Sequence, residues 1–418
     1  NIPSNMTALN FASNSTTWIS MGNTYWSTVT DGGDTIMANE DLTWEKTLSH
    51  NIGLDFSFFK GRLNGSVEVY HNTTKDLLIQ FPTAGSGYEY QYRNMGSVQN
   101  QGLEVSLNAV LVERDNFGLT VGANISLNQN KVLNLGGLDR IDSETRWASS
   151  EVGVDYVVLP GEPLGNMYGY VSDGYYSVDD FSGYDSEKGE WTLREGIADA
   201  SAIIGEQYLR PGAMKLKDFD GDGEITSDDK KVIGNALPLG TGGFSLSGYL
   251  YGIDFSANFN YVFGNDIYNA NKIEFTSSRK YERRNLMKTG EQRWTNVDWT
   301  TGQLVNDPDQ LEKMNEGATL WSPAVGNAVF SDWAVEDGSF LRLSSATIGY
   351  TLPSHLTMKA KISRLRFYVT GTNLFCLTGY SGYDPEVDTR RSTPLTPGVD
   401  YSAYPKSIGY VVGVNLTF

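Results

Sequence analysis

The stretch 408–418, Ile-Gly-Tyr-Val-Val-Gly-Val-Asn-Leu-Thr-Phe, places an apolar residue at every second position. Its apolar members are Ile408, Tyr410, Val412, Val414, Leu416 and Phe418. Because successive side chains of a strand point to opposite faces, this period of two predicts a strand with one apolar side. Its length matches the ~9–11 residues that a tilted strand needs to cross a bilayer. A soluble β-sandwich can end on such a strand too, so the rest of the chain has to decide between the two.

The same alternation recurs in eight further segments of the chain. These segments are 52–58, 63–69, 103–111, 119–127, 244–250, 253–263, 340–350 and 365–369. Together with the last strand, the pattern predicts about nine strands that each have one apolar and one polar face.

The connections between these segments alternate strictly between short and long. The short ones are 60–62, 113–116, 251–252 and 353–362, and the long ones are 72–101, 131–241, 264–338 and 376–406. Bacterial outer-membrane barrels have short periplasmic turns and long extracellular loops, whereas a soluble sandwich gives no reason for such asymmetry. We therefore predict an all-β fold, an antiparallel transmembrane β-barrel that crosses the cell outer membrane many times, with residue 418 on the periplasmic side.

The predicted strand count is odd, because the first strand starts on the long-loop side and the last one ends on the short-turn side. A closed antiparallel barrel made of one bacterial chain has an even number of strands, and an open sheet would expose two edges to lipid. Either a weak strand lies within 1–47, around 17–26, or the chain is part of a larger barrel. We favour the second interpretation.

Composition excludes several further classes of protein and of site. The chain has 418 residues, and no segment approaches the ~18 consecutive apolar residues of a membrane helix. The net charge of -18 argues against nucleic acid as a partner, because its binders need a basic surface. One cysteine, Cys376, rules out an intrachain disulfide framework, and three histidines far apart in sequence make a histidine-based metal site or triad improbable.

One segment, 218–229, has the pattern of an EF-hand-type calcium loop. Hard oxygen ligands at alternate positions suit Ca²⁺, and glycine at the sixth position allows the sharp turn that such a loop needs. Position 12 is an aspartate, a shorter carboxylate than the usual glutamate, which predicts modest affinity for a structural ion. The alternative is an acidic surface turn. The candidate ligands are Asp218, Asp220, Asp222, Glu224 through its carbonyl, and Asp229.

Other motifs give weaker signals. The glycine-rich segment 239–244 precedes a strand and lacks the lysine of a phosphate-binding loop, so we reject that interpretation. The acid pair Asp179-Asp180 could serve a glycosidase, but most such pairs are solvated loop residues. Tyrosines in the long connections could stack on sugars or contact peptides, and packing within the loops is at least as good an explanation for each of them.

Ordered motifs along the chain resemble the SusC/RagA-like TonB-dependent transporters of Bacteroidetes outer membranes. Each motif is weak alone, but their number and order make the resemblance specific from about residue 39 to the end of the chain. The motifs lie at 39–47, 51–55, 75–78, 94–104, 165–174, 218–235, 264–269, 337–343, 349–353, 373–375, 382–386 and 404–405.

The resemblance implies that 1–418 is the C-terminal portion of a barrel of about 22 strands, without the N-terminal plug that fills such barrels. It implies an importer, not an enzyme, that takes up oligosaccharides or peptides, is energised through TonB by way of the plug, and works with a SusD-like surface lipoprotein. Connections 131–241, which holds the calcium-type loop, and 264–338 would then lie outside the cell. The alternative is a calcium-stabilised surface adhesin or glycan-binding β protein.

Overall fold

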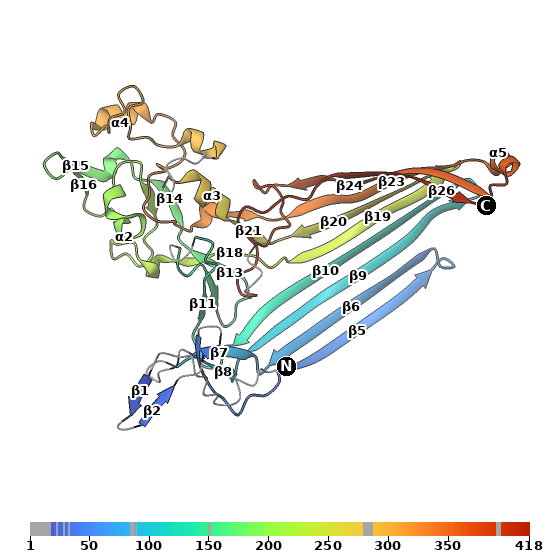
Figure 1. Cartoon of the computed structure of the whole chain (residues 1–418), viewed down its shortest axis with the longest axis horizontal. Coiled ribbons are helices and arrows are strands. Elements are labelled where there is room, and N and C mark those ends of the chain that lie inside the picture. The colour runs from blue at the N-terminus through green and yellow to red at the C-terminus, as the bar shows by residue number, and fades with distance from the viewer. Residues whose placement is uncertain are drawn as a thin grey trace.

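The computed structural model of the chain describes residues 18–21, 24–27, 30–31, 34–83, 88, 90–148, 152–278, 287–389 and 394–418. Its largest element is one curved sheet of long strands that runs across Figure 1. The nine strands of this sheet are β5 (Lys46–Phe58), β6 (Leu63–Lys75), β9 (Ser97–Arg114), β10 (Phe117–Asn134), β19 (Gly240–Leu250), β20 (Ile253–Phe263), β23 (Phe340–Thr351), β24 (Arg364–Thr378) and β26 (Gly409–Thr417).

The nine strands follow one another in the sheet in chain order, and every neighbouring pair is antiparallel. The prediction of nine one-sided strands is thus confirmed. The short turns meet at the end of the sheet that is drawn at the right of Figure 1, and the long connections leave from the opposite end. Strands β9 and β10 are longer than predicted, because their pairing continues into polar residues that the alternation of apolar residues could not mark.

Each face of this sheet has its own chemistry. Rows of directly paired residues read Ile52, Val69, Leu103 and Leu127 on one face, and Asp55, Ser66, Ser106 and Asn124 on the other. The apolar face is uncovered within the described residues: Ile52 is 79% exposed and Val412 is 78% exposed. An apolar outer face and a polar inner face are what a membrane barrel wall requires.

Aromatic side chains on the sheet lie over glycines of the next strand. A Cβ atom on Gly102 would lie 2.2 Å from the carbonyl oxygen of Leu127 and 2.5 Å from the hydroxyl of Tyr70. The Tyr70 hydroxyl donates a hydrogen bond of 2.8 Å to Asn128 Oδ1 on β10. The missing side chain of Gly102 therefore lets Tyr70 bridge three strands, which fixes their register.

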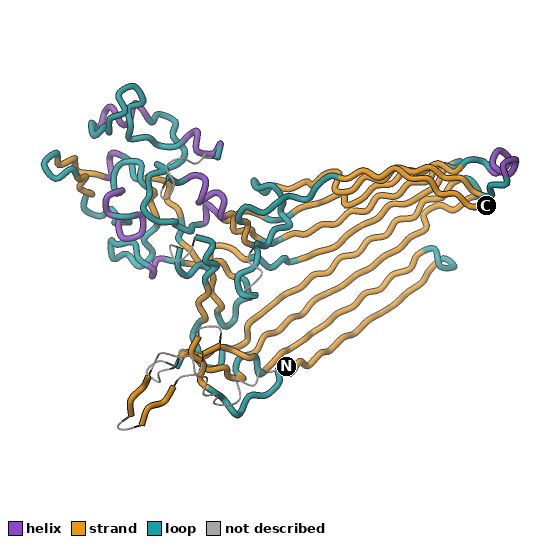
Figure 2. Tube along the Cα trace, in the orientation of Figure 1, coloured by secondary structure: helices purple, strands orange, loops and turns teal. Residues whose placement is uncertain are grey.

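The long connections 76–96, 135–239, 264–339 and 379–408, called here the outer connections, fold into elements of their own. Figure 2 shows that most helical segments gather there. The strands in the first two, or pairing with them, are β3 (Thr30–Asp31), β4 (Asp34–Met37), β7 (Leu78–Pro82), β8 (Tyr90–Asn94), β11 (Ile141–Ser143), β12 (Tyr156–Val158), β13 (Asn166–Gly169), β14 (Ser172–Tyr175), β15 (Phe181–Asp185), β16 (Glu190–Leu193), β17 (Met214–Leu216) and β18 (Lys231–Asn235).

Shorter elements complete the connections between the long strands. They are the strands β21 (Asp266–Asn269), β22 (Val335–Asp337) and β25 (Val399–Asp400), and the helices α2 (Ser201–Ile204), α3 (Ala270–Thr276), α4 (Pro308–Met314) and α5 (Ser354–Thr357), the last of which lies in the turn between β23 and β24. Residues 178–180, 206–208, 227–229, 288–292, 332–334 and 358–360 form 3-10 turns. None of the described helices combines the length and the hydropathy of a membrane-spanning helix.

The buried apolar core of the described residues belongs mainly to the outer connections. One cluster gathers Tyr176, Ile204, Trp294 and Leu311 from two different connections, and a second one centres on the stacked rings of Tyr268 and Phe330. Burial of this apolar surface gives the outer connections a fixed shape rather than that of loose loops.

The sheet remains open, with β5 and β26 at its edges. The segment around 17–26, where we considered a weak additional strand, contains β1 (Trp18–Met21) and β2 (Thr24–Ser27). These two strands pair with each other and not with the nine-stranded sheet, so they do not supply a tenth strand.

Candidate functional site

The predicted calcium-type loop lies between β17 and β18 and turns back on itself twice. Asp218 holds the first turn: its Oδ1 accepts a hydrogen bond of 2.6 Å from the backbone N–H of Gly221, and its Oδ2 accepts one of 3.0 Å from that of Gly223. Gly221 and Gly223 have φ of 78° and 88°, a region that glycine adopts at little cost. The sequence folds this way because aspartate caps tight turns and glycine permits their left-handed residues.

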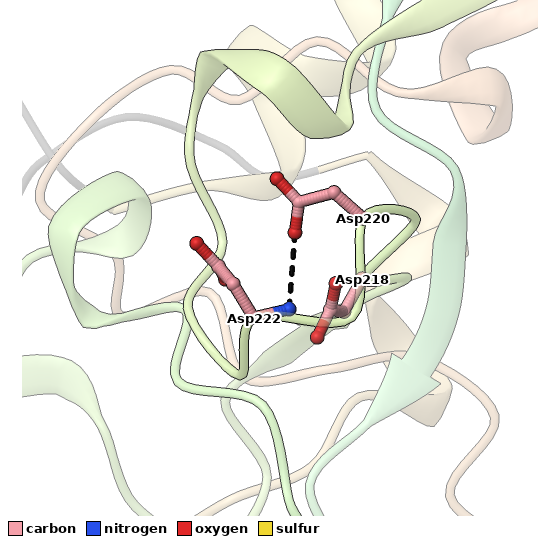
Figure 3. A group of neighbouring side chains, drawn as sticks. All are labelled: Asp218, Asp220 and Asp222. Carbon is pink, nitrogen blue, oxygen red and sulfur yellow. Dashed lines mark hydrogen bonds between the residues drawn. The ribbon is translucent and has the colours of Figure 1, made fainter.

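The next two acidic residues repeat this arrangement on a smaller scale. Asp220 accepts from the backbone N–H of Asp222 at 3.1 Å, and Asp222 accepts from that of Glu224 at 2.8 Å. Figure 3 shows the side chains of Asp218, Asp220 and Asp222 around one small space. One carboxylate oxygen of each lies within 4.8 Å of the others, the sole such trio of potential metal ligands among the described residues. Two oxygens on opposite sides of one Ca²⁺ would lie about 4.6–5.2 Å apart, so this spacing fits the ion.

The two remaining candidate ligands have different surroundings. Asp229 is fully buried, and its oxygens accept hydrogen bonds from the backbone N–H groups of Phe219 at 2.7 Å and Thr226 at 2.8 Å. It therefore closes the loop, and it is not a member of the trio. The Glu224 side chain is exposed, while its backbone forms a bridge to Asp199. The fully buried Ile225 next to it anchors the loop in the apolar cluster around Tyr176.

Repulsion from neighbouring carboxylates affects the protonation of Asp220. The backbone N–H of Asp222 favours the charged form of Asp220. Partial desolvation and the carboxylates of Asp222, Asp229 and Asp218 outweigh this bond and raise the pKa of Asp220 above its usual value. A cation between these carboxylates would remove the repulsion.

A buried carboxylate, Asp155, and a half-buried ammonium, Lys230, lie beside the loop. Asp155 accepts hydrogen bonds from the backbone N–H of Thr145 at 2.8 Å and from its hydroxyl, and burial raises the pKa of Asp155 to about 6. Lys230, next to Asp229, donates a hydrogen bond of 2.7 Å to the carbonyl of Val154, and burial lowers the pKa of Lys230. The hydrogen bond of Lys230 attaches the end of the loop to the residues just before β12, and so connects two distant parts of the same outer connection.

An ion network around the buried Arg342, which no sequence motif predicted, ties the last outer connection to the sheet. Arg342 on β23 lies 2.6 Å from Asp384 and 2.8 Å from Glu386, and Lys406 lies 2.5 Å from Glu386. Arg342 is 4% exposed and Asp384 is 5% exposed. The four residues lie in or next to the motifs 337–343, 382–386 and 404–405, so these motifs share a structural role. An arginine at a polar-face position of a strand was the signal that could have pointed to an acidic partner.

Three tyrosines of the outer connections are buried packing residues. Tyr170, Tyr176 and Tyr380 are buried, and the hydroxyl of Tyr380 donates a hydrogen bond of 2.6 Å to Asp400. Tyr383, in contrast, is 85% exposed. Stacking on a ligand is therefore open to Tyr383 and not to the three buried rings.

Asp180, one member of the acid pair considered for a glycosidase, lacks the raised pKa of a general acid. Asp180 accepts from Lys215 at 3.0 Å and from the backbone N–H of Ser177 at 2.7 Å. Burial opposes ionisation, but these hydrogen bonds outweigh it and lower the pKa of Asp180. A general acid needs a raised pKa, so Asp180 serves the structure of this segment.

Known proteins share this combination of an amphipathic sheet and folded outer connections. The family described as "TonB dependent receptor-like, beta-barrel" matches residues 3–209. TonB-dependent receptor P39 of Formosa agariphila is 32% identical over 91% of this chain and 36% of its own length. The chain belongs to the TonB-dependent receptor family. TonB-dependent receptor SusC of Bacteroides thetaiotaomicron is 27% identical over 95% of this chain and 34% of its own length.

The fold of this TonB-dependent receptor chain also matches a solved structure. The RagAB peptide importer in its "closed-closed" state superposes with a TM-score of 0.66 at 24% identity, over 96% of this chain and 38% of that chain. The resemblance to the SusC/RagA-like branch is thereby confirmed, and the nine-stranded sheet is barrel wall in the outer membrane. The chain spans about a third of the length of the curated relatives that it matches.

Proposed function

We propose that this TonB-dependent receptor chain is the C-terminal barrel portion of an outer-membrane nutrient importer, with 131–241 and 264–338 as extracellular connections. The observation that carries the proposal is the open nine-stranded sheet with an apolar outer face and a polar inner face. Two uncovered edges in lipid are unstable, so further strands have to complete the wall around a polar lumen. A polar lumen of this kind suits polar solutes such as oligosaccharides or peptides.

Two partners follow from this proposal. A plug domain would close the lumen and take energy from TonB, and a SusD-like surface lipoprotein would dock on the outer connections. The packed cores of these connections support docking, because a preformed surface binds a partner with less loss of conformational entropy than loose loops. The SusC relative and the RagAB structure support this branch of the family.

Uptake by cells that carry the full-length protein tests the proposal. Fluorescent oligosaccharides and oligopeptides of graded length would be offered with and without collapse of the inner-membrane proton gradient. We expect accumulation of one class, lost both on deletion of the gene and on collapse of the gradient. Equal accumulation in the deletion strain for every substrate would contradict import. Co-purification of a SusD-like lipoprotein with the full-length protein from solubilised membranes would test the proposed partner.

We also propose that the loop 218–229 binds one structural Ca²⁺. The spacing of the Asp218, Asp220 and Asp222 carboxylates and their mutual repulsion support this proposal. Glu224 would add its carbonyl oxygen. Asp229 would have to give up part of its bonding to backbone N–H groups to become a ligand, so we expect it to orient the loop in the absence of the ion.

Calorimetric titration of the full-length protein with Ca²⁺ tests this second proposal. The variant Asp222→Ala should lose the binding heat, whereas Asp228→Ala, an exposed residue of the same loop outside the trio, should keep it. Absence of binding at millimolar Ca²⁺, or equal heats for the wild-type protein and Asp222→Ala, would contradict the calcium site. Neither result would bear on import.

A further inference from the structure

Charged side chains on the first four strands of the sheet are sorted by sign between its two faces. The inner face carries the carboxylates Asp55, Glu68 and Glu104. The outer-face positions of β5, β6, β9 and β10 between the short turns and the outer connections carry lysines and histidines but neither aspartate nor glutamate. In a chain with a net charge of -18, this absence of acidic residues is a local departure from the overall composition.

The basic residues lie in three successive rows just beyond the apolar rows. His50 lies directly opposite His71, in a row that Gln101 and Gln129 continue. The next row contains Lys131. The row after that pairs Lys46 with Lys75. The histidines are 21 positions apart in sequence and would not have been paired without the register of β5 and β6.

The height of these rows places them at the outer surface of the bilayer. His50 is nine residues from Phe59, the first residue of the short turn. At about 3.3 Å per residue and a strand tilt of about 35–45°, this is roughly 21–24 Å along the membrane normal. The apolar band of an outer-membrane barrel is about 25 Å tall, so the histidine row lies at its outer limit and the lysines lie among the lipid headgroups.

The three lysines differ in whether a carboxylate already neutralises their charge. Lys46 forms an ion pair of 2.9 Å with Asp76, which follows β6. Lys75 and Lys131 are exposed, and neither forms an ion pair with a described residue. Two unneutralised ammonium groups thus stand above an apolar surface, next to two imidazoles that can donate hydrogen bonds.

We propose that Lys75, Lys131, His50 and His71 form a collar that binds the phosphate groups of lipids in the outer leaflet. The ammonium groups supply charge, and the imidazole N–H groups supply directed hydrogen bonds. The apolar row of Ile52, Val69, Leu103 and Leu127 beneath them accepts the acyl chains. A soluble anion would find only exposed lysines of a strongly acidic protein, whereas a lipid phosphate adds burial of its acyl chains. This inference rests on the outer-membrane location and is independent of import.

Native mass spectrometry of the full-length protein in detergent tests the collar. Retention of phosphatidylglycerol would be titrated against that of phosphatidylcholine, for the wild-type protein and for the double variant Lys75→Gln/Lys131→Gln. The control Lys60→Gln/Lys359→Gln removes the same charge at the short-turn end of the sheet. Unchanged heat-modifiable gel mobility would establish that each variant is folded.

We expect preferential retention of phosphatidylglycerol, weakened roughly fivefold for each collar lysine removed and unchanged in the control. A second arm adds millimolar inorganic phosphate, which should not displace the lipid. Equal retention by the collar variant, equal loss in the control, no preference for the anionic lipid, or displacement by inorganic phosphate would each overturn the proposal. Substitution of His50 and His71 by phenylalanine would separate the hydrogen-bond contribution from that of charge.

Discussion

Arg342 on β23 lies 2.6 Å from Asp384 in the last outer connection, and both side chains are almost completely buried. Glu386 places a second carboxylate 2.8 Å from the guanidinium. A buried charge without a partner is strongly unfavourable, so this network couples the position of the connection 379–408 to the barrel wall.

Loss of one partner should therefore loosen the connection. We expect Asp384→Asn to weaken its attachment by about 3 kcal/mol, because Arg342 would remain buried with only Glu386 to neutralise it. Hydrogen exchange of the connection in the full-length protein measures this change. The control Asp142→Asn breaks the exposed pair with Arg140 and should cost about 0–1 kcal/mol. Similar changes in hydrogen exchange for both variants would show that the network around Arg342 stabilises its connection no more than an exposed ion pair does.

The outer face of β26 should be sensitive to charge. Val412 lies in a row with Val369 and Ile348 that faces lipid, and the adjacent Val411 faces the lumen beside Thr370. We expect Val412→Lys to destabilise the barrel by about 2–4 kcal/mol and Val411→Lys, at nearly the same depth, to have a much smaller effect. Urea unfolding in lipid vesicles gives both values. Equal values would mean that the two faces are not divided between lipid and lumen.

Gly102 should not tolerate even a methyl group. In Gly102→Ala the new Cβ would meet the Leu127 carbonyl oxygen at 2.2 Å, and backbone cannot move aside without loss of strand pairing. We expect a loss of more than about 1 kcal/mol of stability and a lower yield of folded protein on gels. Gly53→Ala is the control, because its Cβ would meet only the flexible Glu68 side chain at 3.2 Å. A fully stable Gly102→Ala variant would show that the strands are spaced differently.

The stability of the segment around Asp155 should depend on pH. Burial raises the pKa of Asp155 to about 6, above the value of 3.8 for an exposed aspartate, so the folded state holds the proton more tightly than the unfolded state. The resulting stabilisation is complete below about pH 4 and disappears as the pH rises through 6. Asp155→Asn should abolish this dependence and gain roughly 1–3 kcal/mol at pH 7.

Hydrogen exchange of residues 141–158, corrected for the intrinsic effect of pH, measures that difference between pH 4.5 and pH 7. The exposed residue Asp142 provides the control, since Asp142→Asn should leave the pH dependence intact. If Asp155→Asn keeps the full dependence, another group is responsible for it.

Local pattern was sufficient to predict the barrel wall. Side-chain direction in a strand alternates with every residue, so Val412 and Val414 reveal a lipid-facing side without any knowledge of their neighbours. The alternation of short and long connections then predicted which end of the sheet faces the cell exterior. The acidic trio could be predicted for a similar reason, because Asp218, Asp220 and Asp222 lie within five residues and form most of their contacts inside the same turn.

The outer connections could not be predicted in this way. The network of Arg342 with Asp384, the cluster of Tyr176 with Leu311, and the pairing of β21 with β25 join residues that are tens of residues or more apart. Such contacts depend on how much apolar surface and charge are buried when distant segments of the chain pack together. The local alternation of apolar and polar residues carries no information about this burial. Asp229 shows the same limit: its place in the calcium pattern was visible, but its use as an acceptor of backbone N–H groups was not.

The sequence by itself determined that this protein is an outer-membrane barrel wall. A bilayer requires apolar side chains at every second position of each strand and long loops on one side of the membrane only, and both features are visible in the sequence. Only the tertiary structure decided which residues meet: His50 with His71 and the collar lysines on the outer face, and Arg342 with Asp384 and Glu386. Strand register and burial determine these contacts, and both are properties of the folded chain as a whole.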